Sequence, residues 1–268
     1  MSRFLGDPER VGPRLGFVPL LIVVCALSVS AQRGTPPGPP PTPKAAAPID
    51  ITGNWVSVVT EDWRWRMLTP KKGDTSSIPV SPEGKRIADA WDPANAAADG
   101  CKAYGAAAIM RVPGRLKISW QDDRTLKIET DAGMQTRVLS FDPSTSSGQV
   151  DAVAGPRTWQ GRSMAEWEKI PQPGGLGVSL QQAPPRTGTL KVVTRNLRAG
   201  YLRKNGVPYS EDTLVTEYFD RFSAYGSEWL TVLTNVDDPK YLSQQYLTST
   251  HFKRESDASK WMPMACEQ

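Results

Sequence analysis

The chain has 268 residues and a formal net charge of +4, from 32 basic and 28 acidic side chains. This small and scattered excess argues against a nucleic-acid-binding protein. His251 is the only histidine, which excludes a two-histidine metal site within one chain. The sequence also has no phosphate-binding loop or dinucleotide fingerprint, and we predict neither a metal nor a cofactor. Nine tryptophans and 24 prolines instead indicate a β-rich domain with a binding surface.

Residues 1–31 are predicted to be a secretory signal peptide. Three arginines begin it, an apolar run extends from Leu15 to Val29, and Val29-Ser30-Ala31 fits a small-x-small cleavage site. The run is too short for a comfortable transmembrane helix, although an uncleaved N-terminal anchor is the alternative. We expect a secreted or periplasmic protein that meets the membrane only through this peptide.

Residues 32–48 are predicted to be a Pro-rich linker. Proline removes backbone donors and favours an extended conformation, so this segment cannot build a core. A spacer is expected, and a polyproline ligand for a recognition domain is the alternative. The remaining residues, 49–268, are predicted to form a single folded domain.

Two cysteines, Cys101 and Cys266, remain once the signal peptide and its Cys25 are removed. In an oxidising compartment an even pair is most simply a disulfide, whereas two free thiols are the alternative. The bridge would tie the first half of the domain to the extreme C-terminus. Closing so long a loop stabilises the folded chain by at most roughly 5 kcal/mol.

The folded part begins with a predicted strand from Ile51 to Val59, which is rich in β-branched residues. Residues 63–67 alternate tryptophan with arginine, which predicts a strand with indoles on one face and guanidinium groups on the other. Ser81 followed by Pro82 predicts the start of a helix that runs to about Trp91.

Two three-stranded meanders follow from the alternation of apolar and polar residues. Their predicted strands cover residues 115–121, 124–130 and 134–141, and then 213–223, 228–237 and 245–255. Between the meanders we expect a strand over Leu190–Asn196 and a hairpin turned by Asn205-Gly206. Residues 143–156 and 171–187 are predicted to be loop connections.

About ten strands and one short helix in about 220 residues predict a mainly β domain. We expect one antiparallel sheet that closes, or nearly closes, into a barrel. A two-sheet β-sandwich is the alternative. An outer-membrane barrel is less favoured, because no lipid-facing apolar band recurs across the strands.

Gly53-Asn54-Trp55 on the first strand resembles the Gly-x-Trp motif of the lipocalin and calycin barrels, and Thr216-Glu217-Tyr218 is similar to their second block. The resemblance implies a lipocalin-like barrel in which the tryptophan closes one end. It also implies that Arg254, near the last strand, is the basic residue that packs on Trp55.

The chain also resembles a family of secreted bacterial proteins of unknown function, some of which have lipocalin-like barrels. The resemblance covers most of residues 50–266 and rests on residues 50–55, 159–163 with 166–168, 237–241 and 250–252. It implies secretion and a barrel-like fold, and it supplies no catalytic residue. The helix-bearing segment near 70–105 and the long loop region 142–188 depart from the lipocalins.

The candidate ligand-binding residues are aromatic and arginine side chains that could surround the apolar body and the polar end of a small molecule. They are Trp63, Trp65, Trp120, Tyr218, Trp229, Arg64 and Arg66. Core packing is the alternative for each aromatic residue, and a solvated strand face is the alternative for the arginines. Both faces of residues 213–223 are mixed, so the inward face of that strand stays open.

We expect a binding protein for a small apolar or aromatic ligand of unknown identity, with its oligomeric state left open. One alternative is a hydrolase or isomerase that uses Glu166 and Glu168, or His251. Nothing in the sequence brings two of these groups together, so no catalytic residue is assigned. The other alternative is a module that binds an envelope protein through a sheet edge or exposed tryptophans.

Overall fold

The computed structural model describes residues 39–94, 100–141, 155–168 and 188–266. The predicted signal peptide, residues 32–38 of the predicted linker and most of the two predicted loop connections lie outside the described residues. Pro40–Gln268 is one compact unit and so includes residues 40–48 of the predicted linker. The Trp167 indole N–H donates to the Pro43 carbonyl at 2.8 Å, which fixes this stretch against the domain.

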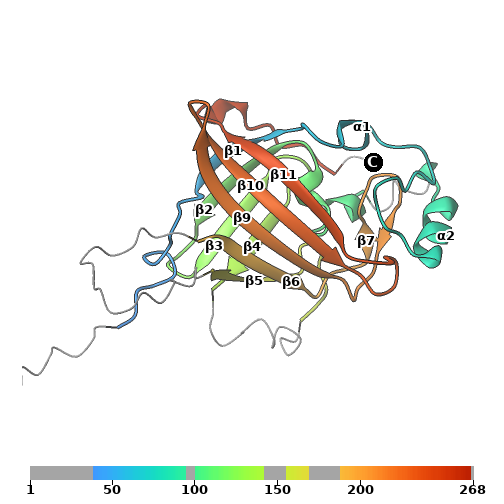
Figure 1. Cartoon of the computed structure of the whole chain (residues 1–268), viewed down its shortest axis with the longest axis horizontal. Coiled ribbons are helices and arrows are strands. Elements are labelled where there is room, and N and C mark those ends of the chain that lie inside the picture. Colours follow the sequence, from blue (N-terminus) through green and yellow to red (C-terminus); the bar gives the residue numbers. More distant parts are fainter. Residues whose placement is uncertain (1–38, 95–99, 142–154, 169–187, 267–268) are drawn as a thin grey trace, which may run out of the picture. The chain divides into compact units, whose positions relative to one another are not determined.

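Nine strands close into a barrel in the part of the chain that the structure describes (Figure 1). Their order around the barrel is β1-β11-β10-β9-β6-β5-β4-β3-β2. The bounds are β1 Gly53–Val58, β2 Arg115–Trp120, β3 Thr125–Thr130, β4 Thr136–Ser140, β5 Arg162–Trp167, β6 Leu190–Arg195, β9 Leu214–Ala224, β10 Ser227–Asp237 and β11 Tyr246–Arg254. The predicted barrel and both predicted meanders are confirmed, and the alternative sandwich does not form.

One pair of neighbouring strands is parallel, which corrects the prediction of a purely antiparallel sheet. An odd number of strands cannot alternate in direction all the way around a closed wall, so nine strands require a parallel pair. That pair is β4 and β5, which are matched only at Leu139 with Ser163 and at Ser140 with Met164. In contrast, β9 and β10 are antiparallel partners along their whole lengths of 11 residues each.

Inward-facing side chains fill the interior of the barrel. Leu126, Leu190, Phe219 and Leu230 come from four different strands, and each has 0% of its surface exposed. A side chain with no accessible surface has no water-sized space beside it. The barrel interior is therefore a packed core around these residues.

Trp55 lies inside one end of the barrel, where the lipocalin resemblance places it. It is fully buried, and its indole N–H donates to the Ile51 carbonyl at 2.9 Å. The guanidinium carbon of Arg254 lies 4.8 Å from the Trp55 ring centroid, so the expected packing of Arg254 on Trp55 is confirmed. Gly53 has a φ of +117° beside this contact, and a Cβ at that position would collide with the Arg254 guanidinium. The glycine of the Gly-x-Trp motif thus makes room for the arginine.

Helices and a small hairpin cover the other end of the barrel, on the right in Figure 1. Turn η2 and turn η3 contribute Tyr104, Ile109 and Met110 to the barrel core, while α2 and the hairpin enclose a second apolar cluster. None of the described helices is both long and apolar enough to cross a lipid bilayer. The bounds are α1 Trp63–Arg66, α2 Pro82–Ala90, η2 Lys102–Tyr104, η3 Ile109–Arg111, β7 Gly200–Tyr201, β8 Pro208–Tyr209 and η6 Ala258–Lys260.

The predicted helix and the predicted hairpin at this end are confirmed. Ser81 caps α2, because its hydroxyl accepts from the Gly84 N–H at 3.1 Å. Strands β7 and β8 pair antiparallel on either side of Asn205-Gly206.

The predicted strand over residues 63–67 is wrong, because residues 63–66 form the helical turn α1. Asp62 adopts a left-handed conformation with a φ of 54°, and the Met67 N–H then donates to the Trp63 carbonyl at 2.8 Å. Alternation produces a strand only where a neighbouring strand completes the hydrogen bonds, and the barrel closes without this segment. Arg64 and Arg66 consequently do not share a face: Arg64 is exposed and Arg66 is buried.

Candidate functional site

A cleft of two adjoining lobes opens at the helix-covered end of the barrel. The inner lobe has a volume of about 40 Å³ and the outer lobe about 160 Å³. Basic and aromatic side chains line the inner lobe: Trp65, Arg66, Arg111, Arg203 and Lys204. The lining of the outer lobe includes Met67, Tyr104, Val112, Pro113 and Met264. We call the two lobes together the cationic cleft.

Two arginines of the inner lobe are paired with the carboxylates that precede α1. Arg66 Nη1 lies 2.9 Å from Glu61 Oε1, and Arg66 Nε donates to the Arg111 carbonyl at 3.0 Å. Arg111 Nη2 lies 2.7 Å from Asp62 Oδ2. Burial, together with the like charge of Arg111, lowers the pKa of Arg66. Each of these two guanidinium groups therefore has its own counter-charge.

Arg203 is the third buried arginine, 6% exposed, and it forms no ion pair with any described residue. Its Nη2 donates to the Ser77 hydroxyl at 2.9 Å, whereas Nε and Nη1 have no acceptor. The Tyr246 hydroxyl lies close by without completing a hydrogen bond of normal geometry. Burial lowers the pKa of Arg203, and the positive charge of Arg111 acts in the same direction. Arg203 thus retains hydrogen-bonding capacity that the described residues do not use.

The Trp65 ring packs against Arg203 of the inner lobe and against the exposed Arg64. The Trp65 ring centroid lies 5.1 Å from the guanidinium carbon of Arg203 and 5.3 Å from that of Arg64. The Trp65 indole N–H donates to Asp74 at 3.1 Å, which fixes the ring. Cation–π contacts of this kind favour a defined position for each guanidinium group.

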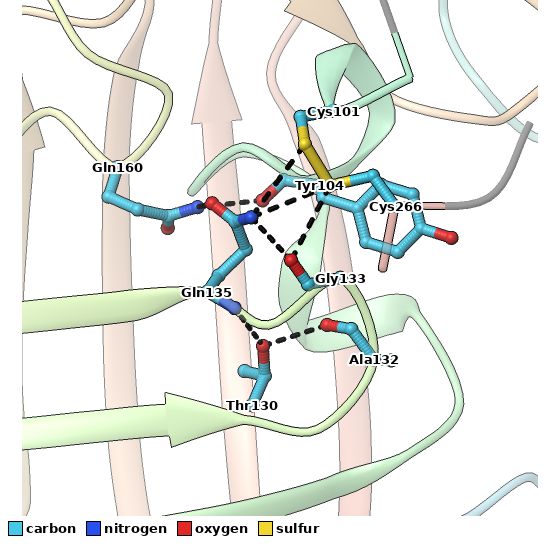
Figure 2. Close-up of a disulfide and its surroundings, with 8 residues drawn as sticks. All are labelled: Cys101, Tyr104, Thr130, Ala132, Gly133, Gln135, Gln160 and Cys266. Atoms are coloured by element: carbon cyan, nitrogen blue, oxygen red, sulfur yellow. Dashed lines mark hydrogen bonds between the residues drawn. A yellow bond between two sulfur atoms is a disulfide. The ribbon is translucent and has the colours of Figure 1, made fainter. Parts of the chain in front are cut away.

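The C-terminal segment forms one wall of the outer lobe. Met264 lines this lobe, and its backbone N–H donates to the Asp131 carbonyl at 2.9 Å. Two residues further on, Cys266 and Cys101 are joined by the predicted disulfide, with their sulfur atoms 2.03 Å apart (Figure 2). The disulfide thereby ties this wall to the chain segment that contains η2.

Figure 2 shows how the surroundings of the disulfide position Tyr104, another residue of the outer lobe. The Gln160 side-chain amide donates to the Tyr104 carbonyl at 2.7 Å and to Gln135 Oε1 at 3.0 Å. The Gln135 amide in turn donates to the Gly133 carbonyl at 2.6 Å. Gly133 has a φ of +73°, and a Cβ there would collide with the Tyr104 ring. Close packing thus fixes the ring beside the disulfide.

The structure places two of the seven predicted binding residues, Trp65 and Arg66, in the cationic cleft. Arg64 stacks on Trp65 from an exposed position, and Trp63 is 60% exposed. The predicted region of the chain thus contributes to a cleft, although in a helical rather than an extended conformation.

The other three predicted residues lie on the barrel, away from the cleft. Trp120 packs inside the opposite end, with its ring centroid 5.5 Å from that of Phe141. Tyr218 precedes the inward-facing Phe219, and Trp229 precedes the inward-facing Leu230, so both point outward. The structure does not bring the predicted aromatic set together around one space.

Two groups of the enzyme alternative, Glu166 and His251, lie on separate strands. Glu166, on β5, pairs with Lys191 at 2.9 Å and is exposed. His251, on β11, has its Nδ1 3.0 Å from the Thr231 hydroxyl. Strands β5 and β11 are not neighbours in the barrel. Among the described residues no group of three or more His, Cys, Asp or Glu side chains is arranged to hold a metal ion.

The basic cleft residues Arg111, Arg203 and Lys204 were not predicted from the sequence. Arg203 and Lys204 immediately precede the Asn205-Gly206 turn, where basic residues are ordinarily solvated. The Asn205 side-chain amide, however, donates to the carbonyls of Lys71 and Asp74 at 2.9 Å each. These long-range contacts anchor the hairpin tip and bury Arg203, and no local sequence pattern signals them.

The fold and the site define a closed, mixed β-barrel protein with a cationic cleft at one end. Comparison with protein-family models, with curated proteins and with solved structures gives no match. The function must therefore be inferred from the chemistry of the cleft.

Proposed function

We propose that this protein is a secreted or periplasmic binding protein for a small molecule that has an apolar or aromatic body and a polar end. The observation that carries the proposal is that apolar and basic side chains lie next to one another in the cationic cleft. Met67, Val112, Pro113 and Met264 offer apolar surface next to the guanidinium groups of the inner lobe. The predicted signal peptide supports export.

The size of the cleft limits the ligand. The outer lobe, at about 160 Å³, is close to an engineered apolar cavity of about 150 Å³ that binds benzene in another protein. Pockets for drug-sized molecules are larger, roughly 300–1,000 Å³. Single-ring compounds are therefore the expected ligands, and long-chain fatty acids and sterols are expected to bind poorly.

Calorimetric titration with benzoate, benzamide and phenol tests the proposal. We expect at least one of them to bind and to change the tryptophan emission, because Trp65 lines the inner lobe. Met264→Trp should fill the outer lobe and weaken binding by about tenfold or more, which corresponds to about 1.4 kcal/mol. Met262→Trp is the matched control, since Met262 belongs to the same segment and is 62% exposed.

Two outcomes would contradict the proposal. The first is the absence of binding by all three compounds at millimolar concentration. The second is an affinity that Met264→Trp leaves unchanged, which would place the bound molecule elsewhere.

A further inference from the structure

The charge balance of the inner lobe identifies the polar end of the ligand. Arg66 and Arg111 each have a carboxylate partner, at 2.9 Å and 2.7 Å. The acceptor of Arg203 is a neutral hydroxyl, that of Ser77. Asp74 acts on Arg203 only through space, because its carboxylate accepts from the Trp65 indole. One buried positive charge therefore has no carboxylate partner among the described residues.

We infer that the ligand is a small aromatic carboxylate whose charged group binds Arg203; the inference rests on the proposed function. A buried guanidinium is unfavourable unless an anion accepts from it, and charge-assisted hydrogen bonds are about twice as strong as neutral ones. The single charge of Arg203 matches one negative charge. A phosphate monoester, with a charge of about −1.5 to −2 at neutral pH, would bring more negative charge than Arg203 balances.

The two lobes divide the ligand between them. The inner lobe, at about 40 Å³, holds only a few atoms, since one water needs roughly 10–15 Å³ of such space. A carboxylate fits there beside Arg203, which lines this lobe and has two guanidinium nitrogens without an acceptor. Val112 and Pro113 line both lobes, so an attached ring passes directly into the outer lobe beside Met67 and Tyr104.

Titration of the full mature chain with three probes of similar size tests this inference. Benzoate should bind about tenfold or more tightly than benzamide, which has nearly the same shape and no charge. Benzoate should also bind more tightly than phenyl phosphate. Rising salt should weaken benzoate binding and leave benzamide binding unchanged.

Substitution of the arginine locates the bound charge. Arg203→Gln should equalise the affinities for benzoate and benzamide, whereas Arg203→Lys should keep part of the preference. Arg198→Gln is the matched control, because Arg198 also stacks on a tryptophan, Trp159, at 4.2 Å, and is exposed. This control should retain the full preference for benzoate.

Comparing the affinities of the three probes for the unsubstituted chain tests the inference even where Arg203→Gln fails to fold. Equal affinities for benzoate and benzamide would overturn the carboxylate class and leave small-molecule binding intact. Tighter binding of phenyl phosphate than of benzoate would show that the cleft prefers a dianion, and would overturn the inference of a carboxylate. Failure of all probes to bind would overturn both this inference and the proposed function.

Discussion

Asp238 is a single carboxylate that organises a turn at the end of β10. It is 2% exposed and accepts from the hydroxyl of Thr213 and from the backbone N–H groups of Ser210, Lys240 and Tyr241. Burial alone would raise the pKa of Asp238, but these hydrogen bonds together outweigh burial and lower it. The aspartate in Asp237-Asp238-Pro239 is thus a structural residue of the turn.

This lowered pKa predicts how Asp238 contributes to stability as pH changes. A carboxylate whose pKa is lower in the folded than in the unfolded chain stabilises fully above its ordinary pKa of 3.8, and the contribution disappears as pH falls through the lower folded value. Asp238→Asn should therefore reduce the free energy of unfolding by about 2–3 kcal/mol at pH 7 and by less below pH 4. Urea unfolding at several pH values measures the difference. A difference that does not depend on pH would contradict the prediction.

Arg137 and Glu217 form an ion pair inside the barrel. Both side chains are completely buried, and two hydrogen bonds of 3.1 Å and 2.6 Å join them. Arg137 Nη2 also lies 3.3 Å from the Thr194 hydroxyl. Alternation predicts the strand that contains Arg137, but side-chain type alone would place Val138 inside. The structure does the reverse, with Val138 48% exposed, because Glu217 from a distant strand compensates the charge.

Removing one member of this pair should be far more damaging than removing both. Glu217→Leu leaves an unpaired buried guanidinium and should lower the free energy of unfolding by about 3–5 kcal/mol. Arg137→Met combined with Glu217→Leu should recover much of that loss. Urea unfolding of the single and double variants provides the measurement. Glu166→Gln, in the exposed pair with Lys191, should change stability by less than about 1 kcal/mol.

Among the helices and strands, the elements whose ends depend on neighbouring residues could be predicted from local sequence signals. Ser81 with Pro82 defines the start of α2, and Asn205-Gly206 defines a hairpin, because caps and turns depend on neighbouring residues. The turn α1 was missed because its conformation depends on distant partners: Arg66 donates to the carbonyl of Arg111. The same dependence explains why only part of the cleft could be predicted.

The C-terminal segment is an element whose position depends on one covalent bond. The disulfide links Cys101 with Cys266 across 165 residues. Replacing both cysteines by serine should lower the free energy of unfolding by about 2–5 kcal/mol. It should also weaken ligand binding, since Met264 in the released segment lines the outer lobe. Guanidinium unfolding with and without reductant measures the effect, and reductant should not alter the double variant.

For the whole molecule, the limits of the folded unit lead to a prediction about truncation. A chain that begins at Pro40 should be as stable as one that begins at Gln32. A chain that begins at Ile49 loses the Pro43 carbonyl as acceptor for Trp167 and the bond from Lys44 N–H to the Asp123 carbonyl. It should be less stable by about 1–3 kcal/mol. Equal thermal unfolding temperatures for the chains starting at Pro40 and Ile49 would contradict this.

The barrel itself could be predicted because its two meanders carry regular alternation and short turns. The direction of β5 relative to β4 could not, since it depends on the number of strands in the closed wall and not on any single segment. The filled interior was equally inaccessible from the sequence. The inward face of β9 has a mixed composition, Val215, Glu217 and Phe219, and only the buried ion pair makes that composition compatible with a core.

The short parallel contact between β4 and β5 is the place where the wall should fray first. Backbone amide hydrogens of β5 should exchange with deuterium sooner than those of β9 and β10. Arg137, on β4, reaches Thr194 on β6 and Glu217 on β9, and so spans this joint from within. The buried ion pair therefore links the strands on both sides of this short contact. Losing the pair should accelerate amide exchange in β5 before it accelerates exchange in the other strands.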